Sequence, residues 1–167
     1  MGALGVITGN EDDLKKLSLE LGRARDLVFV KAIQGEALGL LFHELDCLET
    51  EFLERSVFSS RFQLEIKRRI AEHKFMLVKM RNCPYDEVVH LYGKVCELGF
   101  TNLERDATMR IFFAQYCVKN LRSADAKGIL IDLRSRLAKA YADDGQEVWS
   151  DLINSVDENM PVEDNGK

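Results

Sequence analysis

Apolar residues recur at intervals of three and four positions through most of this 167-residue chain. The first two such sets are Leu14, Leu17, Leu21, Ala24 and Val28, then Leu38, Leu41, Leu45, Leu48 and Phe52. Because an α-helix turns by about 100° per residue, this spacing places each set on one side of a helix. Only two prolines, Pro84 and Pro161, interrupt the chain, which favours long helices over a turn-rich β fold.

Signals for the beginnings and ends of helices divide the rest of the chain into further helical segments. Ser60-x-x-Gln63 and Thr101-x-x-Glu104 have the form of capping boxes, and Ser123 or Asp125 could cap a later helix. Pro84 suits the first turn of a helix, and helices are expected to end at Gly35, Gly99 and Gly145. The helix after Thr101 is expected to bury Leu103, Ala107, Ile111, Ala114, Val118 and Leu121.

No segment shows the sustained polar and apolar alternation of a strand, so the sequence predicts an all-α fold. We expect a single-domain bundle of six to seven antiparallel helices over residues 1–157, with an irregular N-terminus at 1–10. Residues 158–167 are expected to form a loose acidic tail. The longest uncharged stretches, 1–10 and 111–118, are too short to cross a membrane, and no secretory leader is visible. A cytoplasmic location without membrane contact is therefore predicted.

Charge is distributed unevenly between two neighbouring segments. Residues 35–54 carry six acids and no base, whereas residues 55–81 carry eight bases against two acids. Two adjacent helices with complementary flanks would explain this pattern. Alternatively, the acidic helix binds a basic protein, or the basic helix binds an acidic partner or phosphate groups.

Residues suited to catalysis or metal binding are few and scattered. His43, Cys47 and Glu51 drift around one helix, and Glu87-x-x-His90 is half of the paired motif of di-iron bundles without its second copy. The four cysteines form no Cys-x-x-Cys pair and are expected to be reduced, structural thiols. No phosphate-binding glycine loop or nucleophile motif is present. We therefore expect no catalytic residue, no metal and no cofactor, and a non-enzymatic protein is favoured.

The spacing of Arg68 and His73, with four residues between them, resembles the arginine and histidine spacing of helical ribonucleases of the HEPN type. This resemblance implies RNA binding or cleavage through Arg68 and His73, with Arg69 and Lys74 as further nucleic-acid contacts. On one helix Arg68 and His73 lie about 140° apart, so they would converge only through a bend or a partner copy. Aromatic residues for base stacking are scarce there, and nucleic acid is not the partner we expect.

The preferred hypothesis is a cytosolic protein-interaction module, either an adaptor or an antitoxin-like inhibitor of a basic enzyme. The predicted partner-binding residues are Glu44, Glu49 and Glu51 on the acidic helix, together with Phe113 and Tyr116. Phe113 and Tyr116 would form an exposed contact patch, unless their helix is central and buries them. Association with a second copy through the leucine seams is a further alternative.

Overall fold

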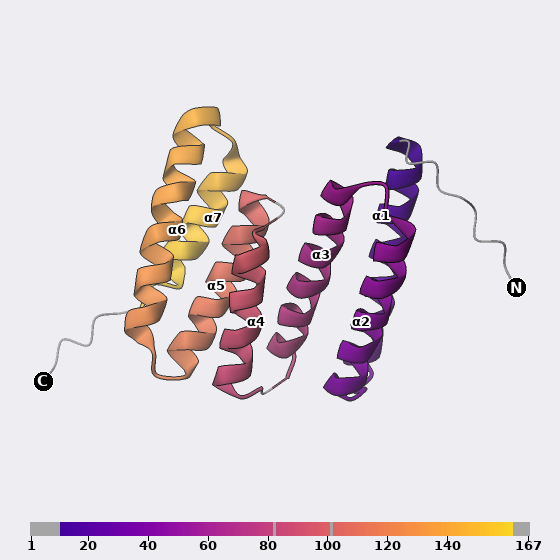
Figure 1. The fold of residues 1–167 in the computed structure, drawn as a ribbon. Helices are drawn as coiled ribbons and strands as arrows, with labels where there is room; N and C mark the ends of the chain where they lie inside the picture. Colours follow the sequence, from indigo (N-terminus) through magenta and orange to yellow (C-terminus); the bar gives the residue numbers. More distant parts are fainter. Residues whose placement is uncertain (1–10, 82, 101, 162–167) are drawn as a thin grey trace, which may run out of the picture. The chain divides into compact units, whose positions relative to one another are not determined.

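The computed structural model describes residues 11–81, 83–100 and 102–161, and this part of the chain is all-α (Figure 1). It contains α1 (Glu11–Ile33), α2 (Leu38–Arg55), α3 (Ser60–Lys79), α4 (Tyr85–Leu98), α5 (Leu103–Lys119), α6 (Ser123–Asp144) and α7 (Glu147–Glu158). The predicted helical bundle of six to seven helices is therefore confirmed. Residues 1–10 and 162–167, where an irregular N-terminus and most of the acidic tail were predicted, lie outside the described residues.

The helices form two compact units, residues 1–99 with α1 to α4 and residues 100–167 with α5 to α7. A single domain over residues 1–157 stays a prediction. In the first unit α1, α2 and α3 pack against one another, and α4 packs against α3. Figure 1 shows α3 between α4 on one side and the α1–α2 pair on the other. In the second unit α6 packs against both α5 and α7.

The core of the first unit is made by the predicted stripes of α1, α2 and α3. Its buried members include Leu17, Leu21, Val28, Leu41, Leu45, Phe52, Phe62, Ile66, Ile70 and Leu77. Narrow stripes with three-and-four spacing suit helices that pack nearly antiparallel, because each side chain enters a gap on the facing helix. The rings of Phe75 and Tyr92, with centroids 5.6 Å apart, join α3 to α4.

The expected helix ends are confirmed at Gly35, Gly99 and Gly145, all of which have positive φ angles. At Gly35 the backbone N–H groups of Gly35 and Glu36 donate to the carbonyls of Ala32 and Lys31, a Schellman motif that needs a left-handed residue. Gly99 differs, since its φ of 73° and ψ of 167° fall in a region open essentially only to glycine.

The predicted N-terminal caps are displaced by one residue or absent. Ser59 rather than Ser60 caps α3, with its side chain accepting from the Phe62 N–H. Asn102 caps α5 by accepting from the Arg105 N–H, whereas Thr101 lies outside the described residues. Helix α6 begins after Arg122 without a side-chain cap, so neither Ser123 nor Asp125 serves this role. A sequence motif identifies the capping chemistry, but the register depends on where the first turn packs.

The predicted apolar stripe of α5 is wrong at its C-terminal end. Val118 is 39% exposed and Leu121 is 93% exposed. Buried residues instead occupy most of the circumference of the middle of α5, among them Met109, Phe112 and Phe113, and leave one side with Thr108 and Gln115 exposed. Leu121 has a φ of 60° and occupies the left-handed position of a Schellman motif, in which Arg122 N–H donates to the Cys117 carbonyl.

Charged side chains contribute to the packing of the second unit. Asp106 on α5 is only 2% exposed, and its carboxylate accepts a 2.6 Å hydrogen bond from Arg110 and forms an ion pair with Arg136 of α6.

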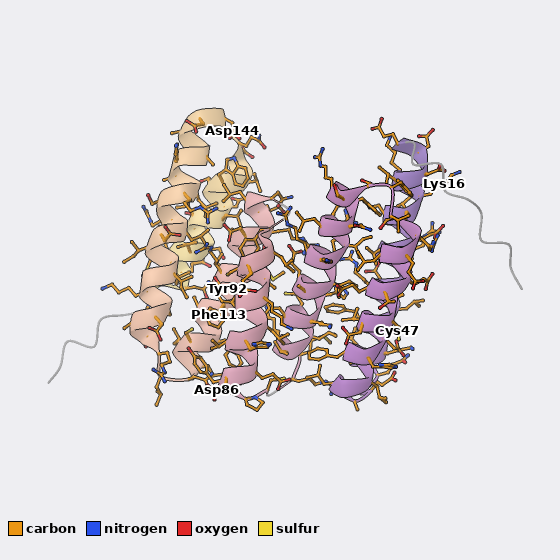
Figure 2. The ribbon with its side chains drawn as sticks, viewed as in Figure 1. Lys16, Cys47, Asp86, Tyr92, Phe113 and Asp144 are labelled. Carbon is orange, nitrogen blue, oxygen red and sulfur yellow. The ribbon has the colours of Figure 1, made fainter. Side chains whose placement is uncertain are left out.

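At the turn between α6 and α7, Asp144 accepts from the Gln146 backbone N–H and from the Trp149 indole N–H (Figure 2). These two hydrogen bonds, that of Gln146 first, lower the pKa of Asp144 below its ordinary value.

Candidate functional site

The basic residues of α3 are engaged mainly by the first unit itself. Arg68 Nε donates to the carbonyl oxygen of Leu98 at 2.6 Å, at the end of α4. Arg69 donates to the hydroxyl of Ser18 at 2.8 Å and forms an ion pair with Glu65. Lys74 forms an ion pair with Asp46 of α2, which is consistent with complementary charge between the two helices.

The structure does not bring Arg68 and His73 together at one site. Arg68 reaches α4, whereas His73 Nε2 lies 3.2 Å from the carbonyl oxygen of Arg25 on α1. Because a carbonyl only accepts, this nitrogen must carry the proton. The His73 ring also meets Phe29 edge-on at a centroid distance of 4.4 Å. The two residues therefore fill structural positions on different sides of α3, and the ribonuclease alternative gains no support from their geometry.

The three acidic residues predicted to bind a partner lie on two different sides of α2. Glu44 and Glu51 are about 20° apart around the helix, but Glu49 is about 140° from Glu44. Glu44 accepts a hydrogen bond from Lys31 of α1, which raises the pKa of that lysine, and Glu51 pairs with Arg55. Only Glu49 faces the side of α2 that borders α3 and α4. A single acidic face made of all three residues is not present.

Phe113 lies on α5 (Figure 2). It is buried, with 6% exposed, whereas Tyr116 is partly exposed. Phe113 therefore does not lie on an exposed patch, in agreement with the alternative in which its helix is largely buried. Binding of a partner through Phe113 and Tyr116 stays a prediction.

An open groove of about 580 Å³ runs along α3 between α2 and α4. Its apolar lining comes from Phe42 on α2, Ile70 and Ala71 on α3, and Leu91 and Leu98 on α4. On α4 the groove extends from Glu87 to Leu98, a length of about 16 Å at 1.5 Å per residue. This length matches about three turns of a helix.

Charged residues border the apolar lining of this groove, and the two edges differ. The α2 edge is purely acidic, with Asp46 and Glu49, whereas the α4 edge is mixed. The remaining charged or titratable lining residues are Lys67, Lys74, Glu87, His90, Lys94 and Glu97. Asp46 is already paired with Lys74, but Glu49 has no hydrogen-bond or ion-pair partner among the described residues. The acidic edge therefore retains a charge that is available to a bound molecule.

Most of the groove was missed by the sequence interpretation, which considered each helix separately. Phe42 and Ala71 lie outside the apolar stripes of their own helices. These two apolar residues were the feature of the sequence that could have indicated the groove. His90 and Glu87, weighed as half of a metal motif, instead lie along the α4 edge.

The remaining candidate chemistry does not converge in the described part of the chain. His43 Nε2 lies 3.7 Å from Cys47 Sγ, and no group of three possible metal ligands occurs among residues 11–81, 83–100 and 102–161. None of the four cysteines forms a disulfide, and only Cys117 is buried. Cys47, labelled in Figure 2, and Cys96 are exposed, so a structural role in the core does not apply to these two. Burial raises the pKa of Cys83. Over the described ranges, no helix combines the length and apolar character needed to cross a membrane.

No protein-family model matches this chain, and comparisons with curated proteins and with solved structures likewise give no match.

Proposed function

We propose that this protein is an interaction module that binds an amphipathic helix of a partner protein in the groove between α2 and α4. The single observation that carries the proposal is the groove itself, which has an apolar lining between charged edges. A bound helix would place apolar side chains at positions i, i+3, i+4 and i+7 against Phe42, Ala71 and Leu98. A bound helix of about three turns, the length of the groove, has three or four apolar side chains at these positions.

The charge of the groove defines the partner helix further. Since the α2 edge carries Asp46 and Glu49 and segment 35–54 contains no base, the flank of the bound helix that faces α2 should be basic. Complementary charge of this kind directs orientation and accelerates association. The expected partner is therefore a protein that presents an apolar helical stripe with lysine or arginine along one flank.

Two synthetic peptides test the proposal directly. Both carry the same leucine stripe at helical spacing, one with lysine flanks and the other with glutamate flanks. Binding to the isotope-labelled protein is followed by fluorescence anisotropy and by amide chemical shifts. We expect the lysine-flanked peptide to bind more tightly and to shift amides of 67–74 and 87–98. Absence of binding by either peptide, or shifts confined to other segments, would contradict the proposed function.

Matched variants separate the groove from general charge attraction. Glu49→Lys should weaken the lysine-flanked peptide at least about fivefold, whereas Glu54→Lys, an equal charge change outside the groove, should not. Ala71→Phe fills the apolar lining and should block both peptides, while Ala138→Phe on the exposed face of α6 serves as its control. Equal effects of each variant and its control would show that the groove does not bind the peptide. Far-ultraviolet circular dichroism verifies that each variant is folded.

A further inference from the structure

The outward side of α1 carries exposed apolar residues that its core stripe does not explain. Leu19 is 63% exposed and Val30 is 47% exposed. Around the helix Leu19 lies about 180° from the buried Val28, and Val30 lies at a slightly smaller angle from it. Arg23 and Asp26 are exposed on the same side. We call Leu19, Arg23, Asp26 and Val30 the outer strip of α1. At about 100° per residue these four side chains fall within an arc of about 60°.

The order of residues in the outer strip is self-complementary. Leu19 and Val30 are equally distant from the midpoint between residues 24 and 25, and so are Arg23 and Asp26. Along the helix the strip therefore reads apolar, basic, acidic, apolar about this midpoint. In an antiparallel pair of identical helices related by a two-fold axis at this midpoint, Leu19 faces Val30 of the other copy. Arg23 then faces Asp26 of the other copy, and the same two contacts recur on the other side of the axis.

The charges of the outer strip are available for such contacts. Neither Arg23 nor Asp26 has a hydrogen-bond or ion-pair partner within the described residues. Farther out, the same register places Lys16, labelled in Figure 2, opposite Ile33 of the other copy. Ile33 is 73% exposed, so the aliphatic part of the lysine can cover it. Every residue of the outer strip thus meets a chemically suitable residue of a second copy.

We propose that this protein forms an antiparallel homodimer through the outer strip of α1. One helix pair buries a small area, so the dimer is weak and reversible, with a dissociation constant on the order of 10 µM or higher. The outer strip shares no residue with the groove between α2 and α4, so the dimer would leave that groove open. The inference therefore stands independently of the proposed function.

Charge reversal and charge exchange on the full-length protein test this dimer. Sedimentation velocity from about 5 to about 500 µM measures the monomer–dimer equilibrium over the range expected for a small interface. Arg23→Asp places two acids opposite each other twice, and Asp26→Arg does the same with two bases. Each single variant should weaken the dimer at least about tenfold, and the double exchange should restore it to within about threefold of the wild type.

Controls exclude effects of net charge and of apolar surface in general. Lys139→Asp makes the same change of net charge as Arg23→Asp on an exposed position of α6 and should leave dimerisation unchanged. Leu19→Ser should weaken the dimer, whereas Ile131→Ser, at a side chain that is 52% exposed on α6, should not. A wild-type protein that remains monomeric throughout the range would overturn the proposal. So would a dimer that both single charge reversals leave intact.

Discussion

Replacing Gly99 by alanine should destabilise the first unit, and the structure separates two reasons. The φ of 73° and ψ of 167° at Gly99 cost a residue with a side chain about 1–3 kcal/mol. In addition, a Cβ atom at this position would lie 3.2 Å from Nη2 of Arg68, so the guanidinium would have to move. Movement weakens the hydrogen bond from Arg68 to Leu98, a contact of a type usually worth about 1.5–3 kcal/mol.

The Leu98 carbonyl can regain part of this energy from water, so the total loss should be about 2–4 kcal/mol. Gly93→Ala is the matched control because Gly93 lies inside α4, the helix that Gly99 ends, and a Cβ there would meet nothing within 4 Å. This control should stabilise the protein by up to about 1 kcal/mol, since alanine favours a helix interior over glycine. The two substitutions add the same methyl group, one inside α4 and one directly after its last residue, and should change stability in opposite directions.

Chemical denaturation followed by circular dichroism measures the free energy of unfolding of both variants. Trp149, the only tryptophan, reports separately on the second unit by fluorescence. In an Arg68→Ala background the cost of Gly99→Ala should fall to the backbone part alone. A Gly99→Ala variant within about 0.5 kcal/mol of wild type would refute the reasoning, because backbone strain alone exceeds that value.

Three further predictions concern the second unit. Leu121→Gly should stabilise the protein by up to about 1 kcal/mol in thermal unfolding, because it relieves a left-handed φ while the 93% exposed leucine loses no packing. Asp106→Asn should cost about 2 kcal/mol in chemical denaturation, because Asp106 is buried among two arginines, whereas Asp132→Asn, at a side chain 58% exposed, should cost less than about 0.5 kcal/mol. Because the folded state lowers the pKa of Asp144, its stabilising effect is present above the ordinary value of 3.8 and is lost as the pH falls through the lower folded value. Trp149 fluorescence should therefore change with a midpoint below pH 3.8, and Asp144→Asn should abolish that step.

The fold class follows from the sequence because helix formation and helix pairing both depend on spacing along one chain. The stripes of α1, α2 and α3 specify which side of each helix is buried, and short connections make consecutive helices antiparallel. The rule fails at α5, where Phe112 and Phe113 widen the buried surface beyond one stripe and Val118 is left exposed. Large aromatic side chains bury more area than valine. The helix is therefore oriented to bury Phe112 and Phe113, and the regularly spaced Val118 is left at the surface.

The candidate site was less predictable because it depends on three helices at once. Residues 35–54 contain six acids, but this number does not reveal that Glu44 and Glu51 point to one side of α2 and Glu49 to another. The same applies to α3, where Arg68 and His73 form a motif in sequence and contact different helices in space. The sequence shows which side chains are charged, but the direction in which each one points is known only once the packing of the helices is known.

The directions and partners of the charged side chains change what the charge asymmetry between residues 35–54 and 55–81 implies for function. Arg68, Arg69 and Lys74 are engaged within the first unit, so most of the apparent positive face of α3 organises the fold and does not attract a ligand. The ion pair between Lys74 and Asp46 contributes little stability by itself, but together with the hydrogen bonds of Arg68 and Arg69 it favours the observed pairing of neighbouring helices. The charges left without partners are then the informative ones. Among the acids of α2 that were predicted to bind, only Glu49 combines such a free carboxylate with an apolar groove, and this combination favours recognition of a basic amphipathic helix.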